Sequence, residues 1–400
     1  MTRRHAEIVG AGFAGLTLGA ALAQRDWTVR IHERSPECRT FGAGIWFWEN
    51  GFRVLNAIGA CDDALDGAVM APSWESFDEG GKTIDRFEFG NHETGGRIFC
   101  IVRQQLYEAV HQAALRSGVE IETSSTAEGA TPEGELIIEG GKRYEADLVV
   151  GADGVNSNVR DTVGLLRKRT VHSDGAIRVI VPFTEEEVCE PGWDRIFELW
   201  SGPRRALYTP CSRETLYLCL TSLAEDREAL QVRVPRDVWA RSFPKLARFI
   251  ERMPEEGRWD RFETIKLHRW SKGRVAILGD AAHAMPPGLG QACGTAVVNA
   301  LGLATTLDEE KDIDRALEVW EARERVLTEH TQWWSWSTWP ITRVPPWLAH
   351  AVFNCPGLSS WIAKQRARPS LYVPYGTAGD PRWLPPEMRT KGAAASAVGA

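Results

Sequence analysis

A glycine-rich turn near the N-terminus constrains the fold of this chain more than any other feature. A short apolar run, residues 6–9, leads into Gly10-Ala11-Gly12-Phe13-Ala14-Gly15, and a run of mostly small residues, 16–23, follows. A second apolar run, 28–32, ends at an acid, Glu33. This order predicts a strand, a tight turn, a helix and a second strand, which is the order of a dinucleotide-binding unit.

Each part of this unit has a physical role at a dinucleotide. Gly10 allows the tight turn, Gly12 lets a pyrophosphate approach the backbone, and Gly15 lets the helix pack closely on the strand. The helix N-terminus offers free N–H groups to the phosphates. Glu33 follows Gly12 by 21 residues, about where a carboxylate accepts hydrogen bonds from a ribose. The candidate residues of this adenine dinucleotide site are Gly10, Gly12, Phe13, Ala14, Gly15, Glu33 and Arg34.

Two later segments repeat the pattern of a strand that ends in glycine. The apolar run 146–150 leads into Gly151-Ala152-Asp153-Gly154, and the run 275–278 leads into Gly279-Asp280 before a helix that begins near residue 292. Either segment alone could be an ordinary turn with an aspartate cap. Both segments, in this order after the N-terminal unit, are harder to explain as turns alone.

With these three segments the chain resembles the single-component FAD-dependent aromatic hydroxylases, the group A flavoprotein monooxygenases typified by p-hydroxybenzoate and salicylate hydroxylases. Within that group it most resembles the hydroxypyridine-carboxylate oxygenases and the 4-nitrophenol monooxygenases. The resemblance covers roughly residues 5–330. It implies an α/β fold in which a Rossmann-like FAD-binding domain is interleaved with a mixed β-sheet substrate domain, an α+β layer, and followed by a long C-terminal helix.

The resemblance also implies a discontinuous FAD-binding domain. The expected parts are 1–71, 101–168 and 268–330 for that domain, 72–100 and 169–267 for the substrate domain, 331–390 for a helical and proline-rich wrap, and 391–400 for a disordered tail. Short alternating runs support strands at 176–181, 195–200, 205–208 and 216–220. Residues 312–337 predict the long helix, with an apolar face of Ile313, Leu317, Trp320 and Val326.

By the same resemblance, further residues would contact the flavin. The loop Phe41-Gly42-Ala43-Gly44-Ile45 would pass beside it, Asp280 would hold the ribityl chain, and Pro287 would lie near the reacting edge of the ring. The cofactor-binding residues implied in this way are Gly44, Ile45, Arg103, Asp153, Asp280 and Gly290. Two departures concern only the local loop geometry: Ala292 stands where the family usually has glycine, and Asn299 where it usually has an acid.

Three positions match pocket-lining residues of the hydroxypyridine-carboxylate oxygenases: Arg178, Arg205 and Tyr217. A guanidinium suits a carboxylate, phenolate or nitro group, because each offers two oxygens to its planar fork. The alternative is that both arginines lie on a solvated face of the sheet. Tyr208 and Tyr217 are candidate substrate contacts, or core tyrosines with a satisfied hydroxyl.

Two tryptophans and two histidines are weaker candidates. Alternation places Trp46 and Trp48 on one side of an extended segment, where they would wall the ring-binding pocket or belong to the core of the FAD-binding domain. His268 is a candidate for helping to deprotonate a phenol, whereas His283 is more often structural at its position. No set of ligands has metal-binding spacing, so we predict no metal.

The predicted activity is an FAD-dependent hydroxylation of a small hydroxylated ring, such as 4-nitrophenol or salicylate. Only one dinucleotide fingerprint is present, so NADH or NADPH would dock transiently and reduce the flavin, and O₂ would then give a flavin hydroperoxide. Three alternatives remain open: a hydroxypyridine-carboxylate oxygenase with ring opening, a flavin oxidase or desaturase of a natural-product pathway, and a non-enzymatic FAD-fold binding protein. The flavin-edge segments 42–45 and Pro287 persist, which argues against the last.

Composition and charge exclude several classes of binding partner. A net charge of −7 without a long basic run argues against nucleic acid, and no apolar run is long enough to span a membrane. The N-terminus does not resemble a signal peptide, and the eight cysteines include no Cys-x-x-Cys pair, so we expect a cytoplasmic protein with reduced thiols. The expected partners are a small aromatic or hydroxypyridine substrate and O₂; a homodimer is left open.

Overall fold

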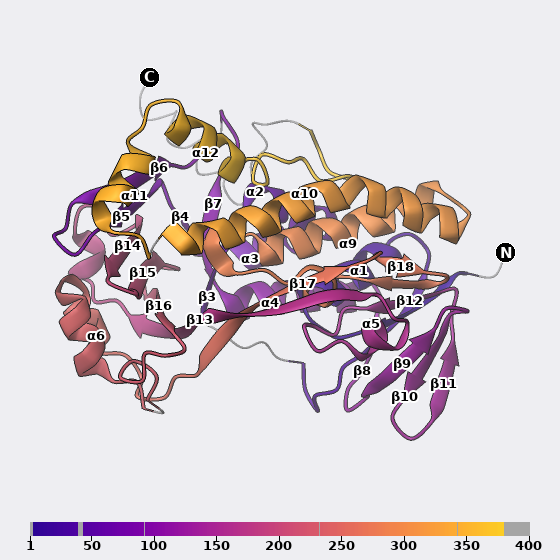
Figure 1. Ribbon diagram of the computed structural model, residues 1–400. Coiled ribbons are helices and arrows are strands. Elements are labelled where there is room, and N and C mark those ends of the chain that lie inside the picture. Colours follow the sequence, from indigo (N-terminus) through magenta and orange to yellow (C-terminus); the bar gives the residue numbers. More distant parts are fainter. Residues whose placement is uncertain (1–2, 39–42, 92, 232, 342, 380–400) are drawn as a thin grey trace.

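The computed structural model describes residues 3–38, 43–91, 93–231, 233–341 and 343–379. Within these residues the strands form one six-stranded sheet, one seven-stranded sheet and two three-stranded sheets, covered by helices (Figure 1). The predicted tail 391–400 lies outside the described residues, as do Phe41 and Gly42 of the predicted flavin loop. The mixed α/β architecture predicted from the sequence is confirmed.

The six-stranded sheet brings the three glycine-containing segments to one edge. Its order is β18 (Ser271–Lys272), β19 (Val275–Ile277), β12 (Leu148–Gly151), β1 (His5–Val9), β2 (Thr28–His32) and β8 (Glu120–Glu122). All neighbours are parallel except β18 and β19. Because β19, β12 and β1 are adjacent and parallel, the turns that follow them lie side by side, where open α/β sheets bind their ligands.

The first helix is buried on nearly all sides. Helix α1 (Phe13–Ala23) consists of small and apolar residues, and it packs between α4 (Arg103–Arg116) and α9 (Ala292–Glu309). Its apolar residues extend around the whole circumference, which is typical of a helix enclosed by protein. The position of α1 is therefore fixed by packing on every side, and its N-terminus is held at the edge of the sheet.

The seven-stranded sheet lies on the other side of the molecule (Figure 1). Its order is β17 (Trp259–Leu267), β13 (Leu166–Pro182), β16 (Thr215–Leu223), β15 (Arg204–Pro210), β14 (Ile196–Ser201), β5 (Ser73–Phe77) and β6 (Thr83–Glu88). Only β14 and β5 are parallel neighbours, so the sheet is mixed. Its strands come from two separate stretches of chain, and the exact domain limits remain a prediction.

The two faces of this sheet have different partners. One face packs its aliphatic side chains against α6 (Arg236–Ser242) and α7 (Ala247–Ile250). The other face carries Tyr217, Cys219 and Phe262, and it packs against β3 (Gly44–Trp48) and Trp339. Because side chains alternate along a strand, neighbouring residues of β13, β15 and β16 belong to different faces.

Shorter elements connect these sheets. Strand β7 (Ile98–Val102) pairs with both β3 and β4 (Val69–Met70). An outer sheet contains β9 (Ala127–Thr131), β10 (Glu135–Ile138) and β11 (Lys142–Glu145). The short helices are α2 (Glu49–Ile58), α3 (Cys61–Leu65), α5 (Asn158–Thr162) and α8 (Asp280–His283), with 3₁₀ turns at η1 (Glu187–Cys189), η2 (Pro244–Leu246) and η3 (Pro287–Leu289).

Helix α10 (Ile313–Ile341) lies along α9 and extends beyond the predicted end at residue 337 (Figure 1). Leu317 and Trp320 are buried as predicted, but Val326 is 64% exposed, so its assignment to the inner face was wrong. The inner position after Trp320 is Glu324, only 1% exposed, because it follows at the four-residue spacing of a helix face.

The predicted wrap contains two further helices. Helix α11 (Pro346–Phe353) packs near β6, and α12 (Leu358–Ala367) contacts α10 and α11. Among the described residues, none of these helices or the others combines the length and apolar character needed to cross a membrane.

Candidate active site

The turn after β1 has the geometry that the sequence predicts. Gly10 has a positive φ of +101°, and its N–H donates to the His32 carbonyl at 2.8 Å. A Cβ on Gly10 would lie 2.4 Å from the Ala152 carbonyl oxygen, and one on Gly15 would lie 2.1 Å from the Gly10 carbonyl oxygen. Both glycines are therefore required by the close packing of the protein itself.

Gly12 is different, because no packing within the described structure requires a glycine there. It has an ordinary φ of −82°, and an added Cβ would meet no atom within 4 Å. Gly12 is also the N-cap residue of α1, and no side chain caps that helix. The first N–H groups of α1 thus point toward open space beside Gly12, which fits the pyrophosphate of a dinucleotide.

Glu33 is fixed beside the same turn. Its Oε2 accepts a hydrogen bond from the Ala11 N–H at 3.0 Å, and its Oε1 accepts one from the Ser35 N–H at 2.9 Å. Each carboxylate oxygen can accept a second hydrogen bond, so the side chain can still take a ribose hydroxyl. Arg34 is exposed next to it.

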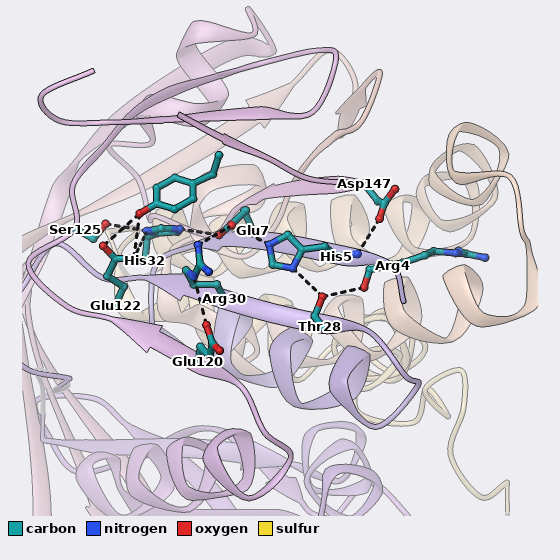
Figure 2. A network of polar contacts seen from close by, with 11 residues as sticks. Arg4, His5, Glu7, Thr28, Arg30, His32, Glu120, Glu122, Ser125 and Asp147 are labelled. Atoms are coloured by element: carbon teal, nitrogen blue, oxygen red, sulfur yellow. Dashed lines mark hydrogen bonds and ion pairs between the residues drawn. The ribbon is translucent and has the colours of Figure 1, made fainter. Parts of the chain in front are cut away.

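A buried polar network supports β2, the strand that precedes Glu33 (Figure 2). The ring of His32 lies 2.7 Å from Glu7 Oε2 through Nε2 and 2.8 Å from Ser125 Oγ through Nδ1. His5 and Arg30 also contact the Glu7 carboxylate. Burial favours a higher pKa for Glu7, but hydrogen bonds from His32 and His5 outweigh it and lower that pKa. The ionised Glu7 therefore joins β1 to β2.

Replacing Glu7 with glutamine should destabilise the protein by ~1–2 kcal/mol at neutral pH, the scale of lost hydrogen bonds to a charged group. Because the folded-state pKa of Glu7 is lowered, its contribution is present above the unfolded pKa and is lost as pH falls through the folded pKa. The check is Tm at pH 7 and through the acid range. Glu120→Gln, at an exposed carboxylate that also pairs with Arg30, is the control. Equal Tm values for both variants would contradict this role.

In the second segment, Ser157 is the N-cap residue of α5, and Asp153 binds further N–H groups at the same helix end. The Asp153 Oδ2 accepts hydrogen bonds from the N–H groups of Asn158 at 2.9 Å and Val159 at 3.4 Å, at the start of α5. This is the structural alternative that the sequence left open. The neighbouring Ala152 carbonyl lies against Gly10, so the segment positions the first turn as well. Direct contact of Asp153 with a cofactor remains a prediction.

In the third segment, Asp280 lies near the N-terminus of α1. Its side chain is exposed, yet the surrounding protein raises its pKa, and the Arg103 charge acts in the opposite direction. Arg103 lies over the Phe13 ring at 4.9 Å, and both Arg103 and Asp280 influence Cys293, whose pKa burial raises to about 12. The turn itself lies against α1, because a Cβ on Gly279 would be 2.9 Å from the Ala14 Cβ. Cys293, in the first turn of α9, was not predicted.

Strand β3 lies between the turn that contains Gly290 and the seven-stranded sheet. The Trp46 ring lies against Gly290, where an added Cβ would be 2.7 Å from it, and Trp46 Nε1 donates to Thr209 Oγ1 at 3.0 Å. Trp48 Nε1 donates to the Leu289 carbonyl at 3.0 Å, within the turn that contains the half-buried Pro287. Both indoles lie on the side of β3 that packs with Tyr217 and Phe262, as the alternation predicts.

The two other predicted residues of β3 lie on its opposite sides. A Cβ on Gly44 would lie 2.5 Å from the Tyr217 Cβ, so β3 lies directly against β16 at this point. Ile45 packs instead against the core of the six-stranded sheet. Strand β3 thus separates the predicted cofactor side from the predicted substrate side.

Arg178 and Tyr217 share the sheet face that meets β3. The Arg178 guanidinium lies 5.8 Å from the Phe262 ring centre and interacts with the Tyr217 hydroxyl. Burial and the neighbouring Cys219 hold the pKa of Tyr217 well above its ordinary value, although Arg178 acts to lower it. The Tyr217 phenol therefore stays protonated and can donate a hydrogen bond.

Arg205 lies on the same face but is already paired. It forms an ion pair with Glu198, whose Oε2 also accepts a hydrogen bond from Trp200 Nε1 at 2.9 Å. The Trp339 ring centre lies 4.4 Å from the Arg205 guanidinium. The predicted positive charge at this position is thus balanced by an acid that the sequence analysis did not identify.

Tyr208 and His268 are not brought together with these residues, which corrects their assignment to the site. Tyr208 lies on the opposite face of the sheet, stacked on Phe197 at 4.3 Å, and its hydroxyl donates to the Trp193 carbonyl at 3.0 Å. It is three residues from Arg205, and an odd spacing along a strand changes the face. His268 is exposed just after β17, beside Arg325 of α10.

His283 has the structural role that its position suggests. Burial lowers its pKa to about 4, and its Nε2 lies 3.0 Å from Asn299 Nδ2. Asn299, one of the two departures from the family pattern, thus holds this ring, and Ala292, the other, is the first residue of α9. In the described part of the chain, no cluster of three or more histidine, cysteine, aspartate or glutamate side chains could hold a metal ion.

Comparison with known proteins agrees with this geometry. Residues 4–354 match a family described as FAD binding domain. A probable 2-heptyl-3-hydroxy-4(1H)-quinolone synthase from Rhodococcus erythropolis is 40% identical over 386 residues, which cover 96% of this chain and 100% of that protein. A 2-heptyl-3-hydroxy-4(1H)-quinolone synthase from Mycobacteroides abscessus is 40% identical over 363 residues, covering 90% and 96%.

A solved structure extends the likeness to three dimensions. The tetrameric form of 2-methyl-3-hydroxypyridine-5-carboxylic acid oxygenase matches with a TM-score of 0.84 and 37% identity, covering 94% of this chain and 99% of that one. The resemblance seen in the sequence is confirmed, and FAD is the cofactor, with NAD(P)H as the reductant typical of the family. The chain belongs to the FAD binding domain family and is an FAD-dependent aromatic monooxygenase.

Proposed function

We propose that this protein hydroxylates the C3 carbon of a 2-alkyl-4(1H)-quinolone. The observation that carries the proposal is the aromatic cluster between β3 and the seven-stranded sheet, which contains Phe262 and Trp339 and against which Trp46 packs. The Phe262 and Trp339 rings are 4.8 Å apart. A fused bicyclic ring with an alkyl chain needs an extended apolar surface of this kind, more than a single small ring does.

The names of the relatives support the same substrate class. Two relatives at 40% identity are named as synthases of 2-heptyl-3-hydroxy-4(1H)-quinolone, a quinolone that carries a hydroxyl group at C3. In a 4(1H)-quinolone the ring nitrogen donates electron density to C3, so this carbon is nucleophilic. One oxygen atom of O₂ would enter the C3–H bond, and the other would leave as water with the two electrons of NAD(P)H.

The residues of the chain divide this task. FAD, when bound, supplies the activation of O₂ with electrons from NAD(P)H. The N-terminus of α1 would bind the FAD phosphates beside Gly12, and Glu33 would hold the ribose. Trp46 would orient the substrate ring beside Gly290 and exclude water, and Tyr217 would donate a hydrogen bond.

A second candidate is the oxygenation of a hydroxypyridine carboxylate, favoured by Arg178. This guanidinium is half-buried on the face that meets β3, and its charge would suit a carboxylate. The single-ring phenols, 4-nitrophenol and salicylate, have less support, because no observation favours a small ring over a large one.

Turnover with a panel of ligands separates these candidates. The holoenzyme is incubated with NADH or NADPH and with 2-heptyl-4(1H)-quinolone, 4-nitrophenol, salicylate or 2-methyl-3-hydroxypyridine-5-carboxylate. We expect the quinolone to stimulate NAD(P)H oxidation most strongly and to gain one oxygen atom. If instead the hydroxypyridine carboxylate stimulates NAD(P)H oxidation and gains oxygen, while the quinolone does neither, the second candidate is supported.

A further inference from the structure

The guanidinium of Arg205 has two nitrogens without a hydrogen-bond partner among the described residues. Arg205 is only 8% exposed, and its Nη2 contacts Glu198. Its Nε and Nη1 are buried and make no hydrogen bond to any described residue. Buried donors without partners are costly, and those of native proteins usually find a ligand or water.

The aromatic neighbours of Arg205 do not satisfy these donors. The ring centres of Trp339 and Trp200 lie 4.4 Å and 5.6 Å from the guanidinium carbon. These contacts stabilise the cation through the ring faces, but a ring face offers no lone pair of the kind that an oxygen offers to an N–H group. Arg205 is therefore held by its neighbours while the N–H groups of Nε and Nη1 stay available.

Arg204, the neighbouring residue, shows the contrast. It points to the other face of the sheet, where Nε lies 2.6 Å from Asp226 Oδ2, Nη1 lies 3.0 Å from Ser242 Oγ, and Nη2 contacts Asp226 and Glu228. Every nitrogen of that guanidinium has a protein partner. The incomplete bonding of Arg205 is thus specific to the face that meets β3.

The ion pair of Arg205 and Glu198 lies on the same sheet face as the aromatic cluster. Arg205 and Thr209 are four residues apart on β15, so they share a face, and Thr209 holds the Trp46 indole beside Gly290. Trp339 contacts both Arg205 and Phe262. The unpaired Nε and Nη1 of Arg205 therefore lie on the sheet face that carries these rings.

We propose that Glu198 and Arg205 together select a neutral ring carbonyl over a carboxylate. Arg205 Nη1 donates to the C4 carbonyl oxygen of the quinolone, which is a strong neutral acceptor because the ring nitrogen conjugates with it. Glu198 cancels the guanidinium charge and repels an anionic group. This inference rests on the proposed function, and it makes Glu198 a specificity-determining residue.

The test is the ligand preference of the holoenzyme, measured by flavin-absorbance titration with two probes that share the bicyclic ring and the heptyl chain. These are 2-heptyl-4(1H)-quinolone, which is neutral, and 2-heptylquinoline-4-carboxylate, which is anionic. The wild type should bind the neutral probe more tightly. Glu198→Gln should reduce this preference by ~10-fold to ~100-fold, because it leaves a buried arginine charge that favours the carboxylate.

Two further variants sharpen the result. Asp226→Asn breaks a comparable ion pair with Arg204 on the opposite face, and it should leave the preference unchanged. The double variant Glu198→Gln/Arg205→Gln removes both charges of the pair, so it leaves no unpaired buried charge that could disturb folding. Its affinity for the carboxylate probe should fall below that of Glu198→Gln, because the arginine that attracts the carboxylate is gone.

An unchanged preference in Glu198→Gln, or a wild type that prefers the carboxylate, would overturn the inference. Product formation is measured separately by mass. A neutral preference that depends on Glu198, with no hydroxylated quinolone formed, would uphold the inference and reject the proposed function.

Discussion

Replacing Gly12 with alanine should leave the apoprotein folded but weaken FAD binding, whereas the same change at Gly15 should destabilise the fold. A Cβ on Gly12 meets no protein atom within 4 Å, but it would fill the approach of the pyrophosphate to the N-terminus of α1. Overpacking of that kind costs ~1–3 kcal/mol of binding free energy. As an N-cap change, the substitution should cost the apoprotein at most ~1 kcal/mol.

At Gly15 the added Cβ would lie 2.1 Å from the Gly10 carbonyl oxygen. The clash should cost ~3 kcal/mol or more, against ~1 kcal/mol gained from the helix propensity of alanine. The measurements are the FAD dissociation constant and the Tm of each apoprotein. If Gly12→Ala binds FAD as tightly as the wild type, the phosphate site lies elsewhere; equal Tm values for the two variants would contradict the packing argument.

The second large effect is expected at Glu324, where glutamine should stabilise the protein above neutral pH. Burial raises the pKa of Glu324 to about 7, although a hydrogen bond from Tyr372 and the charge of Arg323 oppose this. A carboxyl whose folded pKa exceeds the unfolded 4.5 favours the folded state while it is protonated, and that stability is lost as pH rises through about 7. The loss amounts to ~3 kcal/mol by pH 8.

Tm measured at pH 5 and pH 8 tests this expectation. Glu324→Gln should resemble the wild type at pH 5 and exceed its Tm at pH 8, because the amide never ionises. Glu318→Gln, an exposed change on the same helix, should not alter the pH dependence. If the Tm difference between the wild type and Glu324→Gln is the same at pH 5 and at pH 8, the pKa of Glu324 is not raised by burial and the prediction is wrong.

The spacing of glycines and apolar residues along the sequence was sufficient to predict the elements around the first glycine-rich turn. The Gly10–Gly15 turn, the helix after it and the strand that precedes Glu33 form one contiguous segment, so spacing alone gave their order. The same holds for the turns before Asp153 and Asp280. What spacing could not show was whether Asp153 would bind N–H groups at a helix end, because that depends on the position of α5.

The side-chain contacts of the seven-stranded sheet could not be predicted in the same way, because they depend on how strands from distant parts of the sequence pair. Alternation could have excluded Tyr208, since Arg205 and Tyr208 are an odd number of residues apart. Glu198 was visible as an acid within an otherwise apolar strand, but its contact with Arg205 requires the register that sets Trp200 opposite Arg205. Glu324 was missed because the apolar face was continued to Val326, and a buried acid gives no hydrophobic signal.

The most direct test of the central claim is a turnover of the wild-type holoenzyme with 2-heptyl-4(1H)-quinolone, NAD(P)H and O₂ enriched in the heavy oxygen isotope. C3 hydroxylation should give a product with one added oxygen, at C3 of the ring and carrying the heavy isotope, formed in proportion to the NAD(P)H consumed. An unlabelled product, or NAD(P)H consumption without any oxygenated quinolone, would contradict it.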